Sequence, residues 1–181
     1  YLSQGMMGVK MKLGHEDPKI DIARVAGVRK AMGDDVWLAT DANQKWDFPT
    51  AMMVGRELEQ LDVAWFEEPL KPDALQDYIL LRQNAPLPIS GGEVLTRRQS
   101  FQPWLQAGAF DIVQPDVTKV GGISEERRIG WMAEENGIRF IPHGWNTAVG
   151  LAADLQLASA FAGTDLVEYL TGSPYVDEIA E

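Results

Sequence analysis

The feature that most constrains the fold is a regular alternation of short apolar runs with longer amphipathic stretches. The apolar runs, interpreted as buried strands, cover residues 8–13, 36–41, 63–68, 87–93, 110–116, 138–143 and 165–170. The stretches between them, interpreted as helices, cover residues 18–32, 49–61, 72–84, 96–107, 122–136 and 147–162. Strands that alternate with helices through short connections are typical of parallel sheets with helical crossovers. The sequence therefore predicts an α/β fold.

Two architectures are compatible with this alternation, a (β/α) barrel and an open, doubly wound sheet. About seven strands and six helices favour the barrel, although periodicity alone leaves the open sheet as an alternative. A complete eight-stranded barrel takes roughly 250 residues, whereas this chain has 181. We therefore expect an incomplete (β/α) TIM-type barrel that lacks about one strand and one helix.

Composition narrows the possible partners. The formal net charge is −11 and the basic residues are dispersed, so we expect no nucleic-acid partner. No apolar run approaches about 18 residues, so we expect no membrane span. The absence of cysteine excludes disulfides and thiolate zinc sites, which fits a reducing compartment, and we expect a cytoplasmic protein.

An ionisable residue stands at or near the carboxyl end of every predicted strand. In chain order these residues are Lys10 with Lys12, Asp41, Glu67 with Glu68, Glu93, Asp116, His143 and Glu168. A single carboxylate after a strand more often caps the next helix, and a single histidine is more often structural. A barrel would gather all of these strand ends at the face where barrel enzymes carry out their chemistry. Their succession along the chain therefore favours an active site.

Three carboxylates of this series, Asp41, Glu67 and Glu93, fall on successive strands and form an all-oxygen ligand set. Such a set suits Mg²⁺ and disfavours zinc. On neighbouring strands further along, Asp116 and His143 are arranged as a carboxylate that orients an imidazole and stabilises its protonated form. The sequence predicts a magnesium site and an acid–base pair.

The two lysines of "GVKMKLG" lie two residues apart, so Lys10 and Lys12 project from the same face of their strand. A cationic neighbour or a metal ion disfavours the charged form of a lysine. One of the pair could therefore act as a base near neutral pH.

The ordered segments "VKMKLG", "TDANQKW", "WFEEPL", "SGGE", "QPDVTKVGG", "PHGW" and "LVEYL" span residues 8 to about 172. Together they resemble the barrel domain of the enolase superfamily, specifically its mandelate racemase subgroup. The resemblance implies that Mg²⁺ is bound by Asp41, Glu67 and Glu93. It also implies that Lys12 is the base on one face of the substrate and that Lys10 neutralises the substrate carboxylate.

For the opposite face of the substrate, the resemblance implies that His143, paired with Asp116, is the acid or base. Glu168 would hydrogen-bond the enolic oxygen. Asn43, in the D-x-N segment, and Glu68 match positions near the metal, where a substrate-binding or second-layer role and a purely structural role are both open. Lys119 is expected beside the Asp116 carboxylate.

The activity implied by the resemblance is removal of the proton α to a carboxylate, giving an enediolate. Dehydration of a sugar acid to a 2-keto-3-deoxy acid is the favoured outcome, and racemisation or epimerisation of a 2-hydroxy acid is the alternative. The muconate-lactonizing subgroup places a lysine where this chain has Asp116, which argues against a muconate cycloisomerase or a dipeptide epimerase.

Members of the family also carry an α+β capping domain, which residues 1–181 do not supply. We therefore expect a partial barrel domain whose N-terminal capping domain and first strand belong to a longer protein. The complete protein is expected to bind a small sugar acid and to form a homo-oligomer. A catalytically silent barrel fragment is the competing interpretation.

Overall fold

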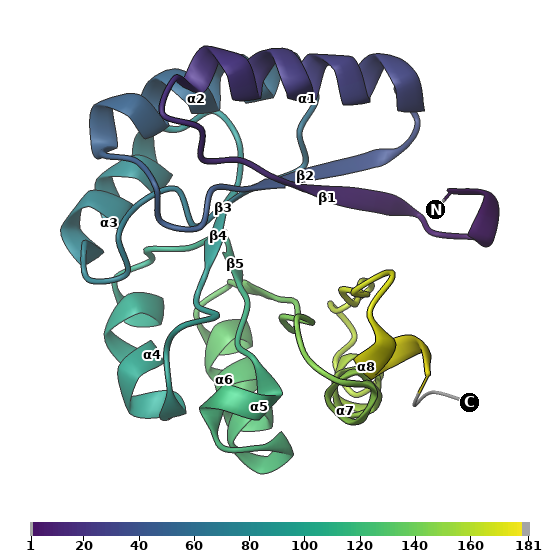
Figure 1. Ribbon diagram of the computed structural model, residues 1–181. Helices are drawn as coiled ribbons and strands as arrows, with labels where there is room; N and C mark the ends of the chain where they lie inside the picture. Colours follow the sequence, from purple (N-terminus) through teal and green to yellow (C-terminus); the bar gives the residue numbers. More distant parts are fainter. Residues whose placement is uncertain (1, 179–181) are drawn as a thin grey trace. The chain divides into compact units, whose positions relative to one another are not determined.

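The structure is a computed structural model that describes residues 2–178, and it confirms the predicted alternation of strands and helices (Figure 1). The strands are β1 (Gly8–Lys12), β2 (Trp37–Asp41), β3 (Phe66–Glu67), β4 (Ile89–Gly91), β5 (Ile112–Val113) and β6 (Arg139–Phe140). The helices are α1 (Pro18–Met32), α2 (Phe48–Gln60), α3 (Leu75–Asn84), α4 (Arg97–Gln106), α5 (Val117–Val120), α6 (Ile123–Glu135), α7 (Ala148–Ala158) and α8 (Pro174–Asp177). A short 3₁₀ turn covers Leu2–Gln4.

The sheet has six strands in the order β1-β2-β3-β4-β5-β6, which is also their order along the chain. Every strand pairing that the structure describes is parallel. The order begins at β1 and ends at β6, so the described strands form an open sheet and not a closed barrel. The expected incomplete barrel is confirmed, with six strands in place of about seven.

The chain divides into two compact units, Tyr1–Ser90 and Gly91–Glu181. In the first unit, α1 packs beside α2 and α2 beside α3, on one side of the strands (Figure 1). Its core is formed by fully buried apolar side chains, among them Leu38, Val54, Leu58, Phe66 and Ile89. Burial of these side chains is the main stabilising contribution to the unit.

Helix starts in this unit follow the expected capping chemistry. Asp17 accepts a hydrogen bond from the Lys19 backbone N–H at 3.0 Å, and Asp47 accepts one from the Thr50 N–H at 3.0 Å. Each carboxylate satisfies a backbone donor that lacks a partner within its helix. Pro18, directly after Asp17, fixes the backbone at the first position of α1. These carboxylates are helix caps and lie outside the strand-end series.

In the second unit, α6 packs against α4, β6 and α7. Its core includes Phe101, Val113, Ile129 and Ala133. Within the described residues 2–178, no helix is both long enough and apolar enough to cross a membrane.

The expected strand at 165–170 is the main difference from the prediction, because the structure shows no strand there. Side-chain hydrogen bonds connect this segment and its neighbour Thr164 with residues near β6. The Thr164 hydroxyl donates to the Phe140 carbonyl at 2.7 Å, and the Gly144 N–H donates to the Glu168 carboxylate at 2.9 Å. Residues 165–170 therefore lie beyond β6 without a regular strand pairing.

Candidate active site

Three of the predicted site residues form one row across the first unit. In the parallel register, Lys12 of β1 is opposite Asp41 of β2, and Asp41 is opposite Glu67 of β3. The next partner in the row is Ser90 of β4. Because paired strands lie about 4.8 Å apart, the register alone brings the lysine and both carboxylates together at the carboxyl ends of their strands.

Each lysine of β1 contacts one of these carboxylates. Lys10 Nζ lies 2.6 Å from Glu67 Oε1, and Lys12 forms an ion pair with Asp41. The carboxylates of Asp41 and Glu67 are buried, and a buried charge is costly unless it is paired. The two like charges on β1 are therefore explained by two opposite charges on the adjoining strands. The Lys12 side chain is 40% exposed against 13% for Lys10, so its amine is the more open to a ligand.

Further hydrogen bonds hold the two carboxylates in place. Asp41 Oδ1 accepts from the Asn43 backbone N–H at 2.8 Å, and Glu67 Oε2 accepts from Trp65 Nε1 at 3.3 Å. Glu68 faces Gln44, whose Nε2 donates to the Glu68 carboxylate at 2.7 Å. Both Asn43 and Glu68 adopt left-handed backbone angles, with φ of 42° and 40°. Such angles are uncommon outside glycine and often occur at functional sites.

In the second unit, His143 lies between two carboxylates. Its Nδ1 is 2.8 Å from Asp116 Oδ2, and its Nε2 is 2.8 Å from Glu93 Oε2. The histidine and Asp116 are buried, whereas the Glu93 side chain is 13% exposed. The structure therefore forms the predicted His143–Asp116 pair and adds Glu93 on the other ring nitrogen.

These contacts determine the charges of the pair. Burial lowers the pKa of His143, but the hydrogen bonds to Asp116 and Glu93 outweigh it and raise that pKa to about 9. Burial raises the pKa of Asp116, and the hydrogen bonds from His143 and Thr118 reverse this and lower the pKa to about 2. The pair is an imidazolium–carboxylate ion pair at neutral pH, so His143 holds a proton that it can donate.

Asp116 is also the N-cap of α5. Its Oδ1 accepts from the Thr118 N–H at 2.8 Å and from the Thr118 hydroxyl at 2.5 Å, which leaves Oδ2 for the histidine. Lys119 Nζ lies 3.6 Å from Oδ2, as expected from the sequence. The capping and catalytic interpretations of this carboxylate are therefore compatible, because the cap fixes the orientation of the residue that orients His143.

Glu168 is placed by the residue that follows the histidine. The Gly144 N–H donates to Glu168 Oε2 at 2.9 Å. A Cβ atom at position 144 would lie 2.3 Å from the Glu168 carbonyl oxygen, so only glycine permits this close approach. Sequence analysis missed this role of Gly144, although its position between His143 and Trp145 in "PHGW" offered a signal.

Replacement of Gly144 by alanine is expected to lower the free energy of unfolding by about 2 kcal/mol, because the added methyl group meets backbone atoms that cannot move aside cheaply. The substitution should also displace Glu168 and reduce turnover of the complete protein. Chemical denaturation measures the first effect. Gly163→Ala is the matched control, because a Cβ there meets nothing within 4 Å. Equal stability of the two variants would contradict the close contact.

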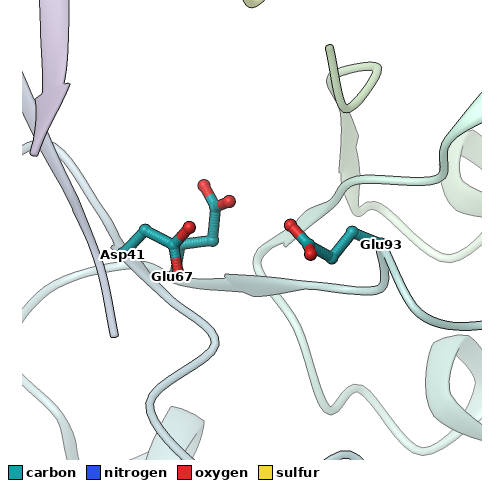
Figure 2. A group of neighbouring side chains, drawn as sticks. All are labelled: Asp41, Glu67 and Glu93. Carbon is teal, nitrogen blue, oxygen red and sulfur yellow. The ribbon is translucent and has the colours of Figure 1, made fainter. Parts of the chain in front are cut away.

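Three of the predicted site residues can serve as metal ligands, since each of Asp41, Glu67 and Glu93 offers one carboxylate oxygen. Figure 2 shows Asp41 and Glu67 side by side at the ends of β2 and β3, and Glu93 on the segment after β4. Glu93 follows by three residues Ser90, the β4 partner of Glu67. This oxygen-only donor set fits a hard cation such as Mg²⁺.

Comparison with known proteins identifies the family. A family model described as "Enolase C-terminal domain-like" matches residues 1–181. D-galactarolactone cycloisomerase of Agrobacterium fabrum is 37% identical over 158 residues, covering 87% of this chain and 42% of the relative. Arabinonate dehydratase of Saccharolobus solfataricus is 36% identical over 179 residues, covering 99% of this chain and 48% of the relative. The chain thus spans less than half the length of these two curated relatives.

Solved structures agree with this result. L-talarate dehydratase from Polaromonas sp. JS666, complexed with Mg and L-glucarate, matches with a TM-score of 0.86 at 36% identity. The match covers 93% of this chain and 46% of that one. The family model over the whole sequence, the two curated relatives and this structural match lead to one conclusion: the chain belongs to the enolase C-terminal domain-like family.

Proposed function

We propose that this chain is the barrel part of a magnesium-dependent lyase that dehydrates a sugar acid to a 2-keto-3-deoxy acid. The observation that carries the proposal is the pairing of ionisable side chains in each unit, Lys12 with Asp41 in the first and His143 with Asp116 in the second. The named dehydratases among its relatives support the same reaction class. On this proposal the N-terminal capping domain and the first barrel strand belong to a longer protein, which forms a homo-oligomer.

The metal would be held by Asp41, Glu67 and Glu93. When bound, Mg²⁺ would act as a Lewis acid that stabilises negative charge developing on the substrate carboxylate. Asp41 and Glu67 are already fixed by backbone and side-chain donors, so little rearrangement of these ligands is needed.

Lys12 is proposed to remove the proton from the carbon next to the carboxylate. The electron pair of the broken C–H bond passes into the carboxylate and produces an enediolate. Lys10, held by Glu67 at 2.6 Å, would neutralise the substrate carboxylate. Asn43 would contact the substrate near Lys12. Preorganised positive charge at the site of developing negative charge is an effective source of catalysis.

His143 is proposed to donate its proton to the hydroxyl on the β carbon, which leaves as water while the enediolate electrons form the new double bond. Tautomerisation of the resulting enol gives the 2-keto-3-deoxy acid. Asp116 keeps His143 protonated before the step, and Glu168 would hydrogen-bond the enolic oxygen. If His143 instead delivered the proton to the α carbon, the product would be the epimer.

Magnesium affinity tests the proposed ligands. Glu67→Gln in the complete protein should weaken Mg²⁺ binding by at least about 100-fold, because an amide replaces a charged oxygen ligand of a hard cation. Isothermal titration calorimetry measures the affinity. Glu57→Gln, the same change at an exposed position of α2, is the control and should bind as the wild type. Equal affinities of the two variants would exclude Glu67 as a ligand.

Product analysis tests the reaction. The complete protein, supplied with Mg²⁺, should convert at least one member of a panel of aldonic and aldaric acids to a 2-keto-3-deoxy acid, detected by NMR. Formation of an epimer without loss of water would favour the racemase alternative. No reaction with any member would favour a catalytically silent barrel.

A further inference from the structure

Two acidic residues of the second unit are fully buried and have no role in the proposed reaction. Glu126 on α6 and Asp154 on α7 are both 0% exposed. Glu126 shares the buried face of its helix with Ile129 and Ala133, and Asp154 shares its buried face with Leu157. Acidic side chains at such core positions are rare unless they are paired.

Three of the four carboxyl oxygens of these residues lack a hydrogen-bond donor among the described residues. Neither oxygen of Glu126 has a hydrogen-bond partner among the described residues, and Oδ1 of Asp154 has none either. Only Oδ2 of Asp154 accepts a bond, from Asn146 Nδ2 at 3.3 Å. An ionised carboxylate buried in this way would lose its hydration without compensation. Binding a proton removes that cost.

The carboxylates around the pair also favour its protonated form, whereas His143 opposes it. Burial, followed by the charges of Asp154 and Asp116, raises the pKa of Glu126 to about 9, against an opposing effect of His143. Burial and the negative charges of Asp116 and Glu168 raise the pKa of Asp154 to about 7. The hydrogen bond from Asn146 and the positive charge of His143 oppose this rise.

The nearby basic groups already have acidic partners. On α4, Arg98 pairs with Glu125 at 2.7 Å. On α5, Lys119 lies 3.6 Å from Asp116. His143 itself lies 2.8 Å from Asp116. On β6, Arg139 forms an ion pair with Asp165. His143, whose positive charge lowers the pKa of Glu126, is thus a group that Asp116 already holds.

We propose that Glu126 and Asp154 form a buried proton-binding pair in which Glu126 carries a proton at neutral pH. The pair lies in the electrostatic surroundings of Asp116 and His143, and the proton on Glu126 removes one buried negative charge from these surroundings. This site is separate from the proposed reaction, because neither residue has a role in it. It would be present even if the chain catalysed nothing.

The proton makes stability depend on pH with a defined sign. The folded state retains the Glu126 proton up to about pH 9, whereas the unfolded chain releases it above the ordinary value of 4.5. Between these values the folded state binds more protons, so stability falls as the pH rises. This group should lower the folding equilibrium constant roughly tenfold for each pH unit in that window. The contribution of the Glu126 proton to folding stability is fully present below pH 4.5.

Infrared spectroscopy of the complete protein tests the proposal directly. The C=O stretching band of a protonated carboxylic acid should be present at pH 7, should move when glutamate carboxyls are labelled with ¹³C, and should disappear above about pH 9. Glu126→Gln, which keeps the shape of the neutral acid, should remove the band. Glu134→Gln, at an exposed position of the same helix, should retain it.

A second variant tests the pairing without changing Glu126. In Asp154→Asn the band should persist and shift in frequency, because the neighbour of the protonated group has changed. A wild-type spectrum without an acid band at pH 7, or a band that glutamate labelling does not move, would overturn the proposal. These outcomes do not depend on turnover, so they are distinct from a failure of the proposed lyase activity.

Discussion

Replacement of Lys12 by alanine in the complete protein is expected to reduce turnover by at least about 10³-fold, the upper range for loss of a general base. The amine at the end of β1 is the group proposed to take the α proton, and Mg²⁺ held by Asp41 would neutralise the carboxylate with which this amine is paired. Mg²⁺ binding should be largely retained, because Asp41, Glu67 and Glu93 remain. Steady-state kinetics and calorimetry measure the two quantities separately.

Two further variants separate the proposed roles of Lys12. Lys12→Arg keeps the positive charge beside Asp41, but a guanidinium stays protonated and cannot act as a base, so this variant should be as inactive as alanine. Lys19→Ala removes an exposed lysine at the start of α1 and should leave turnover unchanged. Substantial turnover in Lys12→Arg would show that the residue supplies charge and not proton abstraction.

Replacement of His143 by alanine is expected to slow dehydration about 10²- to 10⁴-fold. The protonated imidazole is the proposed donor to the leaving hydroxyl, and no other described residue is assigned this role. Because Lys12 is intact in this variant, exchange of the substrate α proton with solvent should continue. Loss of dehydration with retained exchange is therefore the expected signature, detected by NMR in D₂O.

The chain provides a natural control for this variant. His15 is the other of its two histidines and is exposed in the loop after β1. His15→Ala should have wild-type turnover. A His143→Ala variant that still dehydrates its substrate would remove the histidine from the mechanism, whatever the behaviour of Lys12.

Periodicity predicted the helices well because each buries one face. The predicted range 18–32 coincides with α1, where Asp17 and Pro18 mark the start. The apolar runs predicted longer strands than the structure has, since 63–68 contains only the two residues of β3. A run of apolar residues in the sequence indicates that the segment is buried. A strand also requires backbone hydrogen bonds to a neighbouring strand. Residues 165–170 show no such pairing, and the segment is connected to residues near β6 through the side chains of Thr164 and Glu168.

The position of an ionisable residue at the end of a predicted strand was enough to place it near the others, because the register of parallel strands brings their carboxyl ends together. The row of Lys12, Asp41 and Glu67 follows directly from this rule. The contact between His143 and Glu93 was not predicted, because a side chain several bonds long can reach more than one neighbour.

Glu126 and Asp154 were also missed, although a signal existed. Glu126 precedes Ile129 and Ala133 by three and seven residues, which places it on the apolar stripe of its helix. Asp154 precedes Leu157 by three residues on the buried face of α7. An acidic residue on the core-facing stripe of a helix is the pattern that could have identified both.

The central claim is that the protein removes the proton next to a carboxylate and that Lys12 is the base. The most direct measurement is solvent-deuterium exchange at the α carbon of a sugar acid, followed by NMR in D₂O with Mg²⁺ and the complete protein. The wild type should catalyse loss of the α-proton signal, His143→Ala should retain this exchange, and Lys12→Ala should lose it. Loss of the α-proton signal at the wild-type rate in Lys12→Ala, or no loss in the wild type with any acid that the protein binds, would contradict the account.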